Sequence, residues 1–158
     1  MNEVNKMSTW FECKVKYDKM MENGMQKKVT EPYLVDALSF TEAEARIIEE
    51  MTPFISGEFT VSDIKRANYS ELFPCEEDAA DRWFKCKLVF ITLDEKSGAE
   101  KKTSTQVLVQ AADLRDAVKK LDEGMKGTMA DYQIASVAET AIMDVYPYSA
   151  EPNDKPEV

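Results

Sequence analysis

The chain has 158 residues, 44% of them hydrophobic, which suits one globular unit or two small units that share a core. With 30 acidic and 20 basic residues its net charge is -10, and such an overall field disfavours nucleic acid and anionic membranes as partners. Histidine is absent, so the usual general base near neutral pH and the commonest metal ligand are both missing.

The cysteines and the N-terminal residues indicate a compartment. Cys13, Cys75 and Cys86 lie far apart and form no CxxC pair, so neither a zinc-site spacing nor a disulfide framework is present. The polar N-terminus lacks the apolar run of a signal peptide, and no stretch approaches the ~20 apolar residues that span a bilayer. These features predict a cytoplasmic protein with reduced thiols, without a cofactor and without a membrane partner.

The sequence repeats itself at an offset of 73 or 74 residues. Trp10–Val15 aligns with Trp83–Leu88, and residues 72–74 align with residues 145–147. Both tryptophans of the chain stand at equivalent positions, and chance would not hold one register over this length. The sequence therefore predicts an α+β fold built by internal duplication of a ββαβ unit. Each repeat would have antiparallel strands with one helix packed on one face.

The duplication predicts the organisation of the chain. Residues 10–74 form the first repeat and residues 83–147 the second, and an acidic linker at 75–82 joins them. Residues 148–158 carry no apolar period and are predicted to be a disordered tail. One repeat alone buries little, so two repeats together would form a six-stranded antiparallel arrangement with both helices on one side.

Within each repeat two strands come first and are joined by a turn at Gly24 or Gly98. The first strand alternates with period 2, and its inward residues would be Phe11, Cys13, Val15 and Tyr17, matched by Phe84, Cys86, Leu88 and Phe90. The inward residues of the second strand would be Tyr33, Val35 and Ala37, matched by Val107, Val109 and Ala111.

A helix follows, with Ser39 as N-cap and Glu42 completing a capping box, and with Asp113 and Asp116 in the equivalent places. Its buried stripe would comprise Phe40, Ala43, Ile47 and Met51, matched by Leu114, Ala117, Leu121 and Met125. Residues 57–73 and 131–146 are predicted to be extended, with a helix as the alternative at 138–143.

Two segments carry a family resemblance. Trp10–Lys16, together with Tyr33–Ala45 and its motif Leu-Ser-Phe-Thr-Glu-Ala-Glu-Ala, resembles an uncharacterised domain family of gut Bacteroidetes-type bacteria and their phages. The resemblance extends from residue 10 to about residue 147 and implies a lineage without an assigned activity. The element order of each repeat is also similar to the ribosomal L20a-type unit, which binds RNA, and this is an analogy of fold alone.

The sheet face away from the helices is the candidate binding surface. Its tryptophan, lysine and leucine residues are Trp10, Lys14, Lys16, Lys28, Leu34, Trp83, Lys85, Lys87, Lys102 and Leu108. We expect a non-catalytic interaction module that binds a protein partner, or a second copy of itself, through this face or a strand edge. The alternative is single-stranded RNA or DNA, with bases stacked on the tryptophans and phosphates bound by the lysines.

Catalytic and metal sites find little support in the sequence. Cys13 and Cys86 occupy equivalent inward positions and lack an activating histidine, which is typical of structural thiols. The acidic run at 76–81 lacks the ligand spacing and glycine of a calcium loop and is predicted to be a solvated linker. No glycine-rich phosphate loop is present, so the chain is predicted not to be an enzyme.

Overall fold

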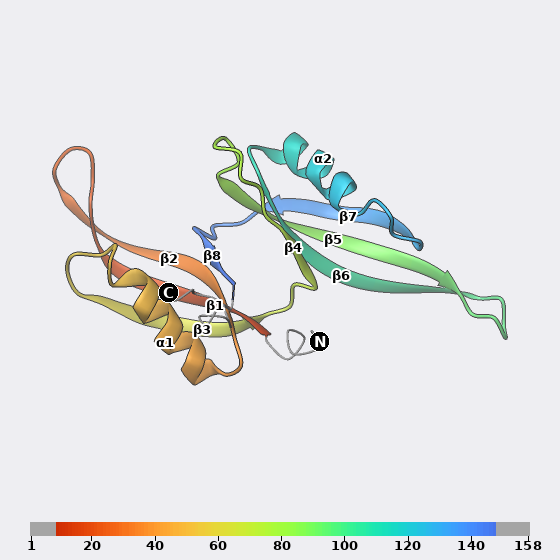
Figure 1. Cartoon of the computed structure of the whole chain (residues 1–158), viewed down its shortest axis with the longest axis horizontal. Coiled ribbons are helices and arrows are strands. Elements are labelled where there is room, and N and C mark those ends of the chain that lie inside the picture. The colour runs from red at the N-terminus through yellow and green to blue at the C-terminus, as the bar shows by residue number, and fades with distance from the viewer. Residues whose placement is uncertain (1–8, 148–158) are drawn as a thin grey trace, which may run out of the picture. The chain divides into compact units, whose positions relative to one another are not determined.

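The computed structural model of the protein describes residues 9–147. These residues form eight strands and two helices: β1 (Thr9–Met20), β2 (Gln26–Ala37), α1 (Phe40–Met51), β3 (Phe59–Ala67), β4 (Glu71–Phe73), β5 (Arg82–Leu93), β6 (Glu100–Ala111), α2 (Leu114–Gly124), β7 (Asp131–Glu139) and β8 (Val145–Tyr146) (Figure 1). The predicted tail, residues 148–158, lies outside the described residues.

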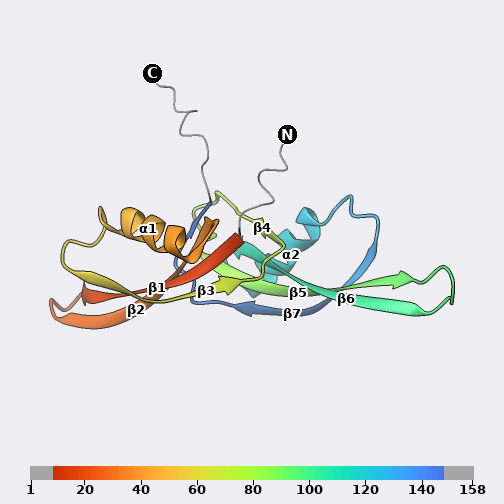
Figure 2. The ribbon, with the colours of Figure 1, turned by 90° about the horizontal axis from the view of Figure 1, so that it is seen from below.

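The chain divides into two compact units. Unit 1 contains residues 9–67 and 142–147 of the described chain, and unit 2 contains residues 68–141. The strand order is β3-β1-β2-β8 in unit 1 and β4-β6-β5-β7 in unit 2. In each unit the helix lies on one face of the three long strands (Figure 2). The α+β class and the duplicated ββαβ arrangement with one helix per repeat are therefore confirmed.

The three long strands of each sheet are antiparallel, whereas the short fourth strand is parallel to its neighbour. The structure has two four-stranded sheets in place of the six-stranded antiparallel arrangement. β4 follows the first repeat but pairs with β6, and β8 follows the second repeat but pairs with β2. The two repeats thus exchange their closing strands, and the compact units do not coincide with the consecutive ranges 10–74 and 83–147.

Local geometry explains the exchange. Trp10 pairs with Ala67 at the end of β3 and with Asp36 near the end of β2, so β3 leaves the sheet where β2 also ends. A parallel strand beside Leu34 and Val35 must begin farther back along β2, so the chain would have to turn around to reach it. Only three residues separate β3 from β4, which is too short for that return.

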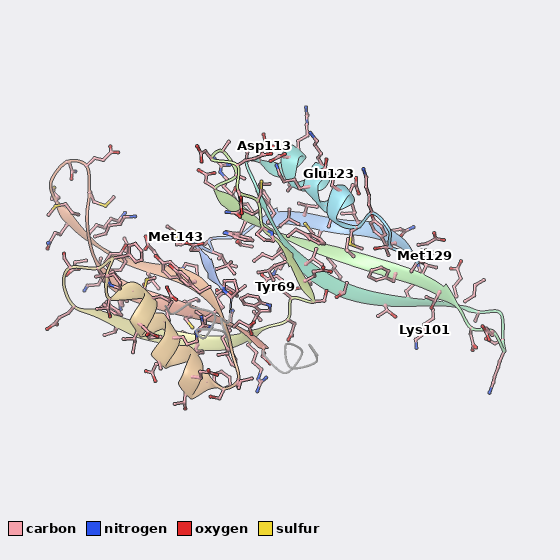
Figure 3. All side chains as sticks on the ribbon, in the orientation of Figure 1. Tyr69, Lys101, Asp113, Glu123, Met129 and Met143 are labelled. Atoms are coloured by element: carbon pink, nitrogen blue, oxygen red, sulfur yellow. The ribbon has the colours of Figure 1, made fainter. Side chains whose placement is uncertain are left out.

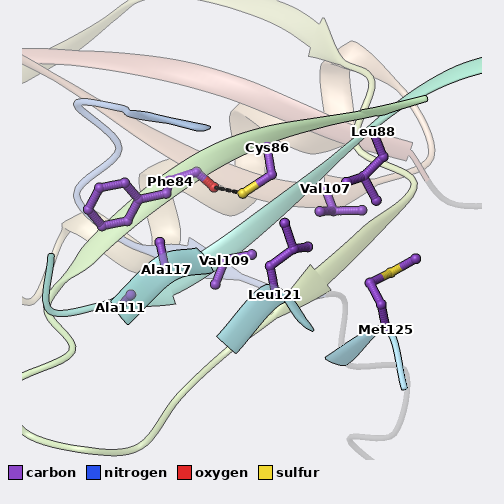
Figure 4. Packing of buried hydrophobic residues seen from close by; sticks show 9 residues of the cluster. All are labelled: Phe84, Cys86, Leu88, Val107, Val109, Ala111, Ala117, Leu121 and Met125. Atoms are coloured by element: carbon purple, nitrogen blue, oxygen red, sulfur yellow. Dashed lines mark hydrogen bonds between the residues drawn. The ribbon is translucent and has the colours of Figure 1, made fainter. Parts of the chain in front are cut away.

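Each unit has its own buried hydrophobic cluster between the sheet and the helix. The buried cluster of unit 1 comprises Phe11, Cys13, Val15, Val35, Ala37, Ala43, Ile47 and Met51. That of unit 2 comprises Phe84, Cys86, Leu88, Val107, Val109, Ala111, Ala117, Leu121 and Met125 (Figure 4). The inward strand positions were predicted correctly, because period 2 places alternate residues on one face. Tyr17, Tyr33 and Phe90 are only partly buried at the margins of these clusters.

The first position of each predicted helix stripe is an exception. Phe40 is 44% exposed and Leu114 is 53% exposed, although the rest of each stripe is buried. Each is the first residue of its helix, and helical side chains tilt toward the N-terminus, so these two extend past the edge of the covered stripe. Phe40 still makes an edge-to-face contact with Phe11, with ring centroids 4.9 Å apart.

Both helix caps form as predicted, with one difference. The Glu42 N–H donates to Ser39 Oγ at 3.1 Å, and the Asp116 N–H donates to Asp113 Oδ1 at 2.8 Å. In a capping box the N–H of the N-cap residue, here Ser39, would donate to the Glu42 carboxylate. The donor is instead the N–H of the preceding residue, Leu38, at 2.6 Å from Glu42 Oε1. Each N-cap therefore satisfies helix donors that would otherwise be unpaired.

The exchanged strand β4 packs tightly on the end of α2. A Cβ added at Gly124 would lie 2.9 Å from the Phe73 ring, closer than a normal contact. We expect Gly124→Ala to destabilise unit 2 by about 1–2 kcal/mol, because this overpacking exceeds the gain in helix propensity of up to ~1 kcal/mol. Urea unfolding measures the change. Gly57→Ala, with nothing within 4 Å of the added Cβ, is the control. A stabilised Gly124→Ala chain would contradict the contact.

Candidate functional site

The outer sheet face carries the predicted binding residues. Residues directly paired between strands share a face, and Lys85 pairs with Leu108, while Lys87 pairs with Gln106. In unit 1 the Lys14 and Lys16 positions belong to the corresponding face. The alternation thus places the predicted residues of each repeat on the face away from its helix.

The predicted binding residues differ in how far their side chains are exposed to solvent. Leu34 and Leu108 have no exposed surface and Trp83 is 4% exposed, so the apolar members are buried apart from Trp10. Trp10 and Lys14 are half-buried. The exposed members are all lysines: Lys16, Lys28, Lys85, Lys87 and Lys102. The surface of the described chain therefore does not display the paired tryptophans expected of a stacking platform.

The two units differ in the charges on this face. In unit 1 the lysines alternate with carboxylates, since Lys28 Nζ lies 3.4 Å from Asp18 Oδ1 and Lys14 pairs across strands with Asp63. Within residues 9–147, Lys85, Lys87 and Lys102 of unit 2 form no ion pair. Lys101, labelled in Figure 3 near the tip of the β5–β6 hairpin, pairs with Thr92 and therefore lies on the opposite face from Lys102. The basic character of the face is therefore concentrated in unit 2.

Each sheet ends at a nine-residue edge strand, β3 in unit 1 and β7 in unit 2. Both have a bulge at the equivalent place. β3 carries Asp63, Lys65 and Arg66, and such charges discourage edge-to-edge pairing. β7 has no charged residue and no proline between Tyr132 and Ala138. The open edge of β3 is therefore protected against pairing with another strand, whereas that of β7 is not.

Residues 9–148 match the domain of unknown function DUF4494. The chain belongs to this family. The match spans both repeats, so the DUF4494 domain is the duplicated pair with its exchanged strands. No curated protein matches the chain.

A buried carboxylate cluster in the DUF4494 domain was not predicted from the sequence. Glu31 is only 8% exposed and lies on the helix side of unit 1. Its carboxylate accepts hydrogen bonds from Tyr17 Oη at 2.8 Å, Tyr33 Oη at 3.2 Å and Lys19 Nζ at 3.2 Å. The Tyr146 ring stacks on Tyr33, with centroids 6.2 Å apart. The cluster therefore satisfies its own charge and braces β1, β2 and β8.

The signal for this cluster was available in the repeat alignment. Glu31 aligns with Thr105, Tyr17 with Phe90 and Tyr33 with Val107. One repeat thus has a carboxylate and two phenols where the other has none. Among residues 9–147, Glu31 is the carboxylate that accepts the hydrogen bonds of both phenols.

We expect the cluster tyrosines to ionise late and to link stability to alkaline pH. Burial, and to a smaller extent the hydrogen bond to Glu31, raises the pKa of Tyr17 to about 12. Burial also raises the pKa of Tyr146 to about 12. The pKa of Tyr33 is raised for the same reasons as that of Tyr17. The fold favours the neutral phenols, so this stabilisation is complete below the unfolded pKa of ~10 and is lost as pH rises through about 12.

Tyrosinate absorbance during a pH titration measures this effect. In the folded chain one group of tyrosines should ionise at higher pH than the others. In urea all tyrosines should ionise at a similar pH. Tyr17→Phe should remove one late tyrosine. An identical titration of folded and unfolded chains would contradict the cluster.

The thiols are placed as expected of structural cysteines. Cys13 and Cys86 are buried, and burial raises the pKa of Cys13 to about 12 and that of Cys86 to about 11. The Cys86 Sγ lies 4.0 Å from the Phe84 carbonyl oxygen (Figure 4). Cys75 is only half-buried, at the start of the linker. Neither buried thiol therefore has an activated thiolate.

We expect one fast thiol and two slow ones with Ellman's reagent. Cys75 should react first, whereas Cys13 and Cys86 should react only when their units open. Cys75→Ser should eliminate the fast phase without changing the slow one. A buried thiol that reacts at its urea-unfolded rate in the native chain would contradict the packing.

The acidic linker pairs with α2. Lys120 Nζ lies 3.1 Å from Glu77 Oε1 and 2.8 Å from Asp116 Oδ2, so one linker carboxylate is held by a helix lysine. Within residues 9–147 no three acidic or cysteine side chains gather into a metal-binding cluster. Over the same residues, neither helix has the length and apolar character needed to cross a bilayer.

Proposed function

We propose that the DUF4494 domain is a non-catalytic protein-interaction module that binds an extended segment of a partner along the open edge of β7. The observation that carries this proposal is the uncharged run from Tyr132 to Ala138 on a long edge strand. An edge strand presents unpaired N–H and C=O groups, and a partner strand can complete the sheet through them.

The hydrogen bonds between β7 and β5 show which backbone groups of β7 are available to a partner strand. The Thr140 N–H donates to the Trp83 carbonyl at 2.9 Å, so Thr140 faces β5. Antiparallel strands alternate in this respect, so Ala138 also faces β5, whereas Val137 and Glu139 direct their N–H and C=O groups to the open side. A partner strand would therefore pair with these residues.

The other repeat supplies the residues for a test. Ala138 and Ser136 of β7 correspond to Lys65 and Asp63 of β3, by the pairing of each with β5 or β1. We expect a tagged wild-type chain to capture a specific partner from an extract of its host. The doubly substituted Ala138→Lys, Ser136→Asp chain should lose that partner, because charged side chains block edge pairing.

Lys65→Ala on β3 is the matched control and should retain the partner. Partner binding should also slow the hydrogen exchange of the backbone amides of Val137 and Glu139. Equal capture by the edge-blocked chain, without protection of these amides, would refute the proposal. Sedimentation of the purified chain identifies the case in which the partner is a second copy.

Single-stranded nucleic acid is the second candidate, favoured by the exposed lysines Lys85, Lys87 and Lys102 of unit 2. The burial of Trp83 and the half-burial of Trp10 weigh against it, because stacking needs accessible aromatic faces. Binding of mixed RNA or DNA that falls steeply with salt and with Lys85→Glu would support this candidate. The absence of such binding at low salt would eliminate it.

The assignment as a non-enzyme, the cytoplasmic location and the bacterial or phage origin of the chain stay predictions. They are compatible with a small intracellular adaptor. Localisation of a tagged chain in its host checks the compartment.

A further inference from the structure

A hollow of about 440 Å³ lies on unit 2 beside Lys87. Every residue that lines it has a polar group in its side chain and none has a carboxylate, although much of the exposed lining is carbon: Asn68, Tyr69, Ser70, Lys87, Ser104, Thr105 and Gln106. This is unusual for a chain with a net charge of -10. The hollow forms where the residues before β4 run along the open side of β6.

Hydrogen bonds hold the wall of the hollow in place. The Ser70 N–H and Ser70 Oγ donate to the Gln106 carbonyl at 2.8 Å and 3.2 Å. Thr105 Oγ1 donates to Ser70 Oγ at 2.9 Å. Within residues 9–147, the Lys87 ammonium, the Ser104 hydroxyl and the Gln106 side-chain amide have no hydrogen-bond partner. Three donors therefore remain available around a braced wall.

The other repeat lacks this arrangement although its backbone is the same. The Met143 N–H donates to the Pro32 carbonyl at 2.9 Å, as the Ser70 N–H does to that of Gln106. Lys14 occupies the position of Lys87, but Met143 and Pro32 replace the serine and the glutamine. The fold therefore does not require polar residues at this place, and their presence in unit 2 alone calls for another explanation.

We propose that this hollow binds the phosphate group of a small molecule, with Lys87 as the charged donor and the Ser104 hydroxyl and Gln106 amide as neutral donors. A charge-assisted hydrogen bond from an ammonium, supported by hydroxyl and amide donors, is the usual way to hold such an oxyanion. The group can arrive as free phosphate or on a mononucleotide, and the volume accommodates both. This site is independent of the β7 edge.

The test follows backbone amide shifts of the ¹⁵N-labelled full chain. Sodium phosphate, uridine 5′-monophosphate and uridine are titrated separately, each at an ionic strength matched with sodium chloride. We expect phosphate or the nucleotide to shift the amides of Ser70, Lys87 and Gln106. Lys87→Gln should weaken binding about tenfold or more, as expected for loss of a charged hydrogen bond.

Two further variants separate the site from general charge effects. Lys14→Gln removes the equivalent lysine of unit 1 and should leave binding unchanged. Ser70→Met installs the residue of unit 1 and should abolish binding, while unchanged amide shifts of α2 report that unit 2 remains folded. Shifts with phosphate alone identify a free-phosphate site, and shifts with the nucleotide alone identify a phosphate carried on a larger molecule.

Three results would overturn the proposal. The first is equal binding of uridine and its monophosphate, since the phosphate would then contribute nothing. The second is a set of shifts that spreads over Lys14 and Lys102 and persists in Lys87→Gln, which would indicate unspecific screening. The third is the absence of any shift with either phosphate compound.

Discussion

Phe84→Ala is expected to lower the free energy of unfolding of unit 2 by about 3–5 kcal/mol. The Phe84 ring is 2% exposed and belongs to the buried cluster between the sheet and α2 (Figure 4). Its removal forfeits the transfer of a large apolar side chain and leaves a cavity that the packed cluster fills only in part. A loss of this size is a large fraction of the stability of a small unit.

Urea unfolding with single-tryptophan chains measures the loss unit by unit. Trp10→Phe leaves Trp83 as the reporter of unit 2, and Trp83→Phe leaves Trp10 as the reporter of unit 1. Phe11→Ala is the equivalent substitution in unit 1 and should have a similar effect there, since Phe11 has no exposed surface. Phe54, which is 75% exposed, is the control, and Phe54→Ala should change stability by ~0.5 kcal/mol or less. Equal effects of Phe84→Ala and Phe54→Ala would refute the packing.

Tyr146→Ala is expected to destabilise unit 1, although Tyr146 follows the whole second repeat. Tyr146 lies on β8, packs against the unit 1 cluster and stacks on Tyr33. The expected loss is about 2–3 kcal/mol, from partial burial of the ring and the aromatic pair. Phe73 on β4 is its counterpart and packs against the unit 2 cluster, so Phe73→Ala should destabilise unit 2 by a similar amount.

Residue-resolved hydrogen exchange separates these effects, because it reports protection strand by strand. Tyr146→Ala should lower the protection of β2 more than that of β6, and Phe73→Ala should do the reverse. The opposite assignment, in which each substitution weakens its own repeat, would show that the closing strands are not exchanged.

The predictions that succeeded depend on local information. Alternation with period 2 identified Phe11, Cys13 and their counterparts as inward, since the pleat alone decides which face a strand residue takes. Ser39 and Asp113 were recognised as N-caps because the capping bond joins residues three positions apart. The exposed lysines Lys85, Lys87 and Lys102 followed from the same alternation.

The candidate site was predicted less completely. The outer positions of Leu34, Trp83 and Leu108 were identified, but alternation does not say whether an outer residue is covered, and all three are buried. The hollow beside Lys87 also escaped prediction. It needs Ser70 from one repeat beside Gln106 of the other, and no spacing in the sequence relates these two residues.

The amino-acid sequence was sufficient to predict a duplicated ββαβ unit, because the repeat is visible at an offset of 73 or 74 residues. Its strands, helices, caps and inward faces were predictable because each depends on residues a few positions apart. The sheet that each closing strand joins became clear from the three-dimensional arrangement of the strands. β2 and β6 each pair with a short parallel strand at the same edge of the repeat, so the alternation of residues does not distinguish the two possible pairings. The choice follows from the direction in which β3 and β7 leave their sheets and from connections too short to turn back.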